Sequence, residues 1–297
     1  MAEKTNNYYV PEQSPWPFIT AAALFFVAFG AANFIQQNSG SGIAANEGTW
    51  GGYVLALGLI GVVVMMFAWF RDTIKESLAH KNSQQMDRSY RMGMVWFIFS
   101  EVMFFAAFFG ALFYVRILAV PWLGGAGAEE MTHELLWPNF QAMWPLTTTP
   151  DGTTTQAMPP WGLPFINTII LVTSSITLTI AHHALVAGQR NKLLINLFLT
   201  LVLGFIFLGL QVEEYIHAYQ EMGLTLDAGI YGSTFFMLTG FHGMHVTIGA
   251  IMLTVMFLRS LKGHLTPDNH FAFEAAAWYW HFVDVVWLFL FVSVYWL

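Results

Sequence analysis

Carboxyl and imidazole side chains recur inside long apolar stretches of this sequence. They are His182, His183, Glu213, Glu214, His217, His242, His245, Glu274, His281 and Asp284. Several stand three residues apart, which places both side chains on one face of a helix. Glu214 and His217 form a Glu-x-x-His pair, the spacing with which some helical bundles bind iron. The residues could therefore bind a metal, carry protons or hydrogen-bond between helices.

A metal site is one of three interpretations of these residues. A di-iron bundle needs a second Glu-x-x-His and two further Glu on partner helices, and within the predicted spans the sequence supplies only the pair at Glu214 and His217. A haem bound by two His from different helices is the second interpretation, and no sequence motif indicates such a haem site. The third is a polar network that points into the bundle and fixes helix packing. We favour the network and expect no metal bound by this chain.

Another acid, Glu101, is flanked on both sides by apolar residues in Trp96-Phe-Ile-Phe-Ser-Glu-Val-Met-Phe-Phe. It has no basic residue within a helical turn. Because apolar surroundings disfavour a carboxylate, we expect a buried carboxyl that is protonated much of the time. Such an acid is either a structural hydrogen-bond donor or a proton-active site.

The composition indicates that membrane helices position these groups. Hydrophobic residues make up 56% of the chain and charged residues 10%, against roughly 25% charged in soluble domains. So few charges cannot cover a water-soluble globule. The absence of Cys excludes disulfides, thiolate zinc sites and iron–sulfur clusters. A net charge of −7 argues against nucleic acid as a partner.

The apolar stretches predict seven membrane spans. They lie at about residues 16–35, 50–70, 94–118, 163–187, 193–219, 231–258 and 271–297. With this topology, every Lys and Arg except Arg116 lies on one side of the membrane. The positive-inside rule then places the N-terminus in the cytoplasm and the C-terminus outside.

We expect a single membrane domain over residues 1–297. Residues 1–93 would hold the first two helices and a charged cytoplasmic connection, and residues 94–297 a five-helix bundle. The external loop 119–162 is rich in Pro and Trp, and we interpret it as an ordered cap or a docking loop.

Cationic side chains at the ends of the spans could bind phospholipid headgroups. The candidates are Arg71 with Glu76, and Arg259 with Lys262 and His264. Guanidinium and ammonium groups can pair with phosphate while their stems lie along acyl chains. The alternative is that they only anchor the helix ends on the cytoplasmic side.

Two long stretches resemble subunit III of cytochrome c oxidase. They are Trp278-Tyr-Trp-His-Phe-Val-Asp-Val-Val-Trp and Thr239-Gly-Phe-His-Gly-Met-His-Val. Shorter matches are Ser100-Glu-Val-Met-Phe-Phe, Asn167-Thr, Ala181-His-His-Ala-Leu, Glu214-Tyr and Arg71-Asp. The sequence departs from the family pattern at Phe70, at Gly110 and in the long external loop.

The resemblance implies an all-α membrane protein with seven transmembrane helices. Its two N-terminal helices would be separated from the five-helix bundle by a cleft that holds structural phospholipids. It implies no catalytic residue and no redox centre, with haem and copper in the partner subunits I and II of a proton-pumping oxidase. The subunit would support proton uptake and stability of the catalytic subunit. Glu101 matches the family's carbodiimide-reactive carboxyl.

Two other functions stay open at this point. One is the equivalent subunit of a quinol oxidase, which usually has five helices. The other is a free-standing proton channel or transporter that uses Glu101, Glu213, Glu214 and Asp284 as a relay, although the sequence shows no repeat halves. The topology indicates a bacterial inner membrane, with the mitochondrial inner membrane as the alternative.

Overall fold

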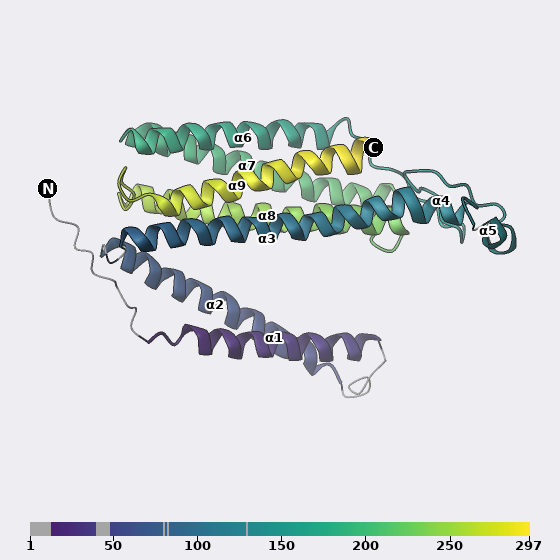
Figure 1. Cartoon of the computed structure of the whole chain (residues 1–297), viewed down its shortest axis with the longest axis horizontal. Helices are drawn as coiled ribbons and strands as arrows, with labels where there is room; N and C mark the ends of the chain where they lie inside the picture. Colours follow the sequence, from purple (N-terminus) through teal and green to yellow (C-terminus); the bar gives the residue numbers. More distant parts are fainter. Residues whose placement is uncertain (1–12, 40–47, 80, 82, 129) are drawn as a thin grey trace. The chain divides into compact units, whose positions relative to one another are not determined.

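The computed structural model describes residues 13–39, 48–79, 81, 83–128 and 130–297 (Figure 1). Within these residues, seven helices are long and apolar enough to cross a membrane, and no β-strand longer than an isolated bridge occurs. The prediction of an all-α membrane protein with seven spans is confirmed. The chain divides into two compact units, Met1–Ser89 and Tyr90–Leu297.

The first unit is a helical hairpin of α1 (Trp16–Ser39) and α2 (Trp50–Leu78). Glycines let the two backbones touch, because a Cβ at Gly30 would overlap the backbone of Leu55 and one at Gly58 that of Val27. Small residues at such contacts are typical of helices that pack within a bilayer, where dispersion contacts rather than the hydrophobic effect hold helices together. The rest of the hairpin surface is largely apolar and exposed.

The second unit is a helical bundle. Its elements are α3 (Gln84–Tyr114, from Tyr90 onward), the π-helix η1 (Val115–Ala119), α4 (Val120–Leu123), α5 (Glu130–Leu136), α6 (Leu163–Val186), α7 (Arg190–Glu221), α8 (Ile230–Leu261), α9 (Phe271–Leu290) and the π-helix η2 (Phe291–Trp296). The third span was predicted at residues 94–118 and in fact continues as helix from Gln84 to Leu123. An apolar window leaves out the polar residues 84–93 at the start of the helix. At its other end, residues 119–123 are apolar and were assigned to the external loop.

Trp280 marks the centre of this bundle. Its side chain is fully buried on α9, and its ring lies against Gly204 of α7 and Gly249 of α8. A Cβ at Gly204 would come within 2.8 Å of the ring, and one at Gly249 within 2.9 Å. The two glycines therefore form the space into which the indole packs, and the indole Nε1 donates to Ser174 Oγ of α6 at 3.0 Å.

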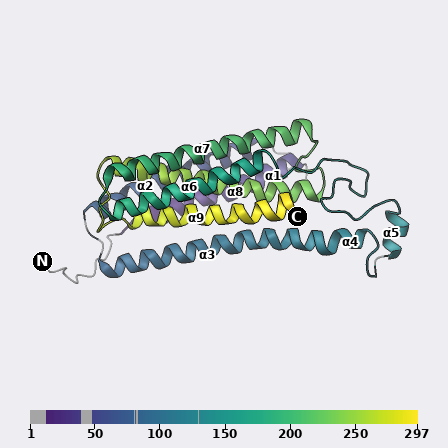
Figure 2. The same ribbon diagram turned by 90° about the horizontal axis from the view of Figure 1, so that it is seen from above.

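Helix α3 is attached to the bundle by aromatic side chains. Phe104 and Phe108 both pack against Phe241 of α8, with ring centroids 5.0 and 5.1 Å apart. Phe97 stacks on Tyr279 of α9 at 6.1 Å. Figure 2 shows α3 beside α9 and extending past the end of α9 toward α4. Large rings thus bridge the distance between α3 and its neighbours, whereas Gly204 and Gly249 allow closer packing at the centre.

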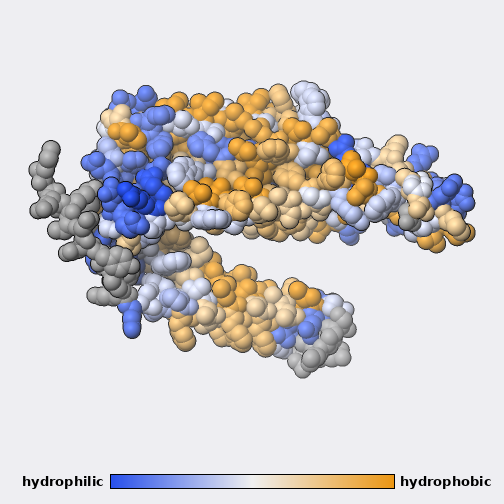
Figure 3. All heavy atoms as spheres, in the orientation of Figure 1, coloured by the Kyte–Doolittle hydropathy of each residue, from blue (hydrophilic) through white to orange (hydrophobic). Residues whose placement is uncertain are grey.

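The outer surface of the bundle helices is apolar. In Figure 3, hydrophobic residues cover the middle of the helices of the second unit on this face, and hydrophilic residues gather toward the ends. Large apolar side chains of the bundle helices, such as Ile195, Phe205 and Phe289, are exposed. In water such a surface would be unstable, so it faces lipid or a partner helix.

Candidate functional site

Polar side chains in the second unit gather at three levels along the helices. We call the end where α6 and α8 finish the histidine end, because His182, His183, His264 and His270 lie there. The opposite end, with the connections 119–162 and 222–229, is the loop end. Between them lies a middle level, which contains Glu101 and His281.

The closest contact at the middle level joins Glu101 of α3 to His245 of α8. Glu101 Oε2 lies 3.0 Å from His245 Nε2, and the two side chains are 21% and 6% exposed. The other ring nitrogen, Nδ1, lies 2.6 Å from the carbonyl oxygen of Phe241. The rings of Phe104 and Phe105 pack against the imidazole. Glu101 is thus partly buried, and its partner comes from a different helix.

This geometry fixes the number of hydrogens that the pair carries. A carbonyl oxygen can only accept, so His245 Nδ1 donates to Phe241 and holds a hydrogen. The contact between Nε2 and Glu101 then needs one more hydrogen, held on either atom. The pair is a carboxylic acid beside a neutral imidazole, or a carboxylate beside an imidazolium. Both arrangements are neutral overall, and one proton shift converts one into the other.

A second polar contact at the middle level links α6 to α9. Ser175 Oγ lies 2.6 Å from His281 Nδ1, and the buried Asp284 lies 3.8 Å from the same nitrogen. Asp284 was predicted to share a helix face with His281, and the structure places them together. Ser175 was missed, because a single Ser within an apolar span carries no motif.

At the loop end, Glu214 is fully buried and accepts a hydrogen bond of 2.6 Å from Tyr295 of η2. Gln211, one turn earlier on α7, is also buried. The sequence did not single out Tyr295, since its role depends on the π-helix that ends the chain. His242 of α8 is fully buried closer to the middle, and its Nε2 donates to the Val283 carbonyl at 3.2 Å.

The expectation that all of these side chains point into the bundle is wrong for His183, which is exposed near the end of α6, and for Glu213 and His217. The last two are exposed on α7, and His217 Nδ1 pairs with Glu221 at 3.1 Å. Gln211, Glu214 and Ala218 define the buried face of this helix, and a residue at position 217 falls at its edge. The Glu-x-x-His pair is therefore divided between the inside and the outside of the bundle.

A cluster of charged and aromatic groups lies at the histidine end. Arg91 Nη1 lies 2.6 Å from Glu274 Oε2, and the guanidinium lies over the ring of Phe271 at 5.1 Å. The His182 ring packs against His270, with centroids 5.8 Å apart, while the neighbouring His183 is exposed. Glu274 was expected in an intramembrane network, and its partner Arg91 was not predicted.

Of the proposed lipid ligands, Arg259 has the most unusual setting. Its side chain is buried in the last turn of α8, and within the described residues its Nε has no hydrogen-bond partner. Lys262 is exposed and His264 is half-buried in the turn that follows. In the first unit, Arg71 is exposed and Glu76 is half-buried near the end of α2.

The same side chains could bind a metal ion only if several of them converged on one point. Across the part of the chain that the structure describes, no three His, Cys, Asp or Glu side chains come close enough to hold an ion. The division of Glu214 and His217 between two faces of α7 accounts for this at the Glu-x-x-His motif of that helix. The arrangement suits hydrogen bonding and proton exchange between helices.

Comparison with known proteins gives a match over almost the whole chain. The sequence model of the family described as Cytochrome c oxidase subunit III matches residues 6–297. The chain is 40% identical to cytochrome c oxidase subunit 3 of Equus asinus over 297 residues, covering 100% of this chain and 99% of that protein. The proteins of the same name from Latimeria chalumnae and Halichoerus grypus are 40% and 41% identical over the same shares.

Proposed function

Because this chain belongs to the cytochrome c oxidase subunit III family, we propose that it is an accessory core subunit of a proton-pumping cytochrome c oxidase. The match of residues 6–297 to the family is the observation that carries the proposal. Electrons would pass from cytochrome c to oxygen in partner subunits. This chain would hold no redox centre and would contribute no catalytic residue.

Haem and copper would belong to the partner subunits I and II. The exposed apolar faces of the helices supply surface on which such membrane partners, or lipid, can pack. The donor set of this chain suits a metal poorly, because it has no Cys and the Glu-x-x-His motif of α7 is split between two helix faces. We infer that this chain stabilises the complex and takes part in proton transfer.

The proton contribution would centre on the pair of Glu101 and His245. One hydrogen lies between the two side chains, and it can move without changing their total charge. Each partner stabilises the charged form of the other, so the proton can shift from the carboxyl to the imidazole while the pair stays neutral. We propose that it supports proton uptake by the catalytic subunit, which also matches the position of the family's reactive carboxyl.

Phospholipid binding is the second proposed contribution. A buried guanidinium with an unpartnered N–H at a helix end favours an anionic partner, and a phospholipid phosphate fits that requirement. Arg259 is the main candidate, with Lys262 and His264 beside it. Arg71 and Glu76 would act likewise near the end of α2.

The histidine end would face the cytoplasm and the loop end the outside. Cationic residues support this orientation, since Arg71, Arg91, Arg190 and Arg259 all lie near ends on the proposed cytoplasmic side. We propose the bacterial inner membrane, and the animal origin of the relatives keeps the mitochondrial inner membrane as the alternative.

This orientation can be tested by labelling. Because the chain has no Cys, a single Lys262→Cys or Leu226→Cys variant can be labelled selectively. An impermeant thiol reagent added outside intact cells should label only the Cys at position 226.

Removal of this chain from the oxidase tests the proposed function. The complex that remains should still reduce oxygen at first, because the redox centres are in other chains. It should pump fewer protons per electron and should lose activity faster during turnover. Unchanged pumping and lifetime would contradict the supporting role.

A free-standing proton channel is the remaining different function. The pair of Glu101 and His245 is the observation that favours it. Proton flux through the isolated chain in liposomes, abolished by Glu101→Leu, would support the channel and count against an accessory subunit.

A further inference from the structure

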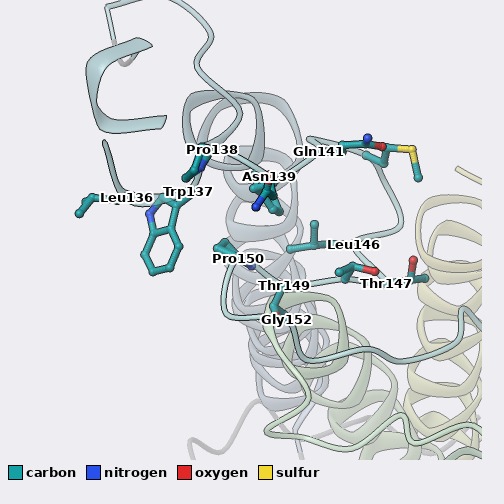
Figure 4. A pocket seen from close by; sticks show the side chains of 13 residues that line it. Leu136, Trp137, Pro138, Asn139, Gln141, Leu146, Thr147, Thr149, Pro150 and Gly152 are labelled. Atoms are coloured by element: carbon teal, nitrogen blue, oxygen red, sulfur yellow. The ribbon is translucent and has the colours of Figure 1, made fainter. Parts of the chain in front are cut away.

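The connection 119–162 contains a pocket that the proposed function does not use. Thirteen residues between Leu136 and Gly152 line a volume of about 390 Å³. Figure 4 shows Trp137, Pro138 and Asn139 on one segment of the pocket and Thr147, Thr149 and Pro150 on another. None of the lining residues carries a charge. We call this feature the loop pocket.

Local hydrogen bonds hold one wall of the loop pocket in place. Thr149 and Thr153 are joined across the turn Pro150-Asp151-Gly152 by a backbone bond of 2.9 Å, and Thr155 donates to Thr147 at 2.8 Å. Pro and Asp suit the first positions of such a turn, and Gly152 adopts a φ of +89° that favours glycine. The wall is therefore formed before any ligand arrives.

Contacts with the bundle fix the rest of the connection. The backbone N–H of Gln156 donates to the Met222 carbonyl at 3.2 Å, and that of Met158 donates to the Tyr231 hydroxyl at 3.2 Å. The Trp144 ring packs against the Tyr231 ring with centroids 5.8 Å apart. A pocket on such a rigid support loses little conformational entropy when it binds a partner.

Apolar side chains around the loop pocket are exposed although they lie beyond the apolar middle of the bundle. Figures 1 and 2 both show α5 projecting past the ends of α6 to α9. On and near α5, Met131, Leu135 and Leu136 are 71%, 75% and 61% exposed, and Met143 is 60% exposed. Lipid tails do not reach outside the bilayer, so a protein partner is the natural cover for these side chains.

Charges beside the loop pocket are negative. Asp151 stands between two lining residues, and Glu134 stands two residues before Leu136. Hydrogen bonds from the Thr149 side chain and the Thr153 backbone lower the pKa of Asp151, so it is ionised at neutral pH. The connection 119–162 contains no Lys or Arg. A partner that approaches this surface is favoured if it carries positive charge.

We propose that the loop pocket binds an extended segment of another subunit of the same oxidase, with an apolar residue at its centre and Lys or Arg beside it. Trp137, Pro138 and Pro150 offer flat faces to the apolar residue, and the Asn139 amide can bond to an extended backbone. Asp151 and Glu134 pair with the flanking cations. This inference rests on the proposed function, because the partner is part of the oxidase.

Hydroxyl-radical footprinting of the intact, purified complex tests whether the pocket is covered. Met143 should be oxidised about fivefold or more slowly than in the unfolded chain, because a covered side chain is shielded from the solvent radical. Leu226, 48% exposed at the same end and away from the pocket, serves as the internal control. Oxidation of Met143 at the rate of an exposed residue would overturn the proposal.

A photo-crosslinking amino acid at position 143 then identifies the occupant. The expected product joins this chain to one segment of another oxidase subunit with Lys or Arg near an apolar residue. Glu134→Lys should lower its yield several-fold, and Glu221→Lys, a charge reversal at the loop end, should leave it unchanged. Crosslinks only to lipid, to a soluble electron-donor protein or to a second copy of this chain would contradict the assignment.

The two proposals fail in different ways. If this chain purified without haem-bearing subunits, the proposed function would be wrong and the footprint would have no bearing on oxidase assembly. If the chain purified within the oxidase and Met143 still reacted as an exposed residue, the inference about the loop pocket alone would be wrong.

Discussion

Glu101 Oε2 and His245 Nε2 lie 3.0 Å apart and connect α3 to α8 through one shared hydrogen. The second ring nitrogen of His245 is held by the Phe241 carbonyl, so the imidazole cannot turn without losing a hydrogen bond. Together with the ion pair of Arg91 and Glu274 at the histidine end, this contact is a polar link that fixes the rotation of α3 in the bundle.

Glu101→Gln and Glu101→Leu should therefore differ. The Gln amide can donate to His245 Nε2 and preserve the link, whereas Leu leaves a buried ring nitrogen unpartnered at a cost of about 1–3 kcal/mol. Thermal unfolding of the purified complex should show a lower Tm for the Leu variant and little change for the Gln variant. Both variants should lower proton uptake, because neither carries a transferable acidic hydrogen.

Equal stability of the two variants would show that the hydrogen bond does not hold α3. Proton uptake that is normal in both would show that the pair is structural only. Stability thus reports on the role of Glu101 in helix packing, and proton uptake reports on its role in proton transfer.

Packing around Trp280 gives a matched pair of glycine substitutions on α7. Gly204→Ala should destabilise the bundle by about 1–3 kcal/mol, because the added methyl group overlaps the indole ring. At Gly209 a Cβ meets no atom within 4 Å, and Ala there should be neutral or stabilising by up to about 1 kcal/mol through helix propensity. Denaturant unfolding in detergent measures both. A Gly204→Ala protein as stable as the Gly209→Ala protein would contradict the packing.

Substitution of Arg259 tests the lipid site. Arg259→Gln keeps much of the side-chain length and removes the charge, and it should lower the amount of anionic phospholipid that co-purifies with the complex. Lys262→Gln removes one charge from the exposed neighbour and is the matched control, for which we expect a smaller loss. Mass spectrometry of the extracted lipid gives the comparison. An unchanged lipid content in Arg259→Gln would rule out the headgroup assignment.

The turn at Asp151 should depend on pH. Its pKa is below the ordinary value of 3.8 because the folded turn donates hydrogen bonds to the carboxylate. A pKa that is lower in the folded state means that the carboxylate stabilises the turn above pH 3.8, and that this stabilisation is lost as the pH falls through the folded pKa. The protection factors of the Thr153 and Thr155 amides, which compare the observed exchange with the intrinsic rate at each pH, should therefore fall at acidic pH. In Asp151→Asn the protection factors should already be low at neutral pH and should lose this acid dependence.

The fold was predictable because lipid imposes a strong constraint on sequence. Each span must present about 20 apolar residues and form all of its backbone hydrogen bonds internally. The seven helices could therefore be located from the runs of apolar residues along the sequence. Their polar ends could not, as the extension of α3 from position 94 back to Gln84 shows. Nothing in hydropathy marks where a helix stops once it leaves the bilayer.

The candidate site was predictable in residue type and only partly in geometry. Glu101, His245, Asp284 and Glu214 could be selected because ionisable groups in apolar spans are costly. The pairing of Glu101 with His245 spans 144 positions and requires tertiary structure. Spacing along one helix misled the prediction at His217, because a residue three positions from a buried one can lie at the edge of the buried face.

The most direct test of the central claim is purification of this chain in mild detergent, followed by an optical spectrum and metal analysis of the complex and of the separated chain. The account predicts haem and copper in the complex, together with subunits I and II, and neither in the separated chain. Haem or metal that stays with the isolated chain would contradict a subunit without a redox centre. It would also make the His and Glu side chains of α7 to α9 candidate ligands of that haem or metal.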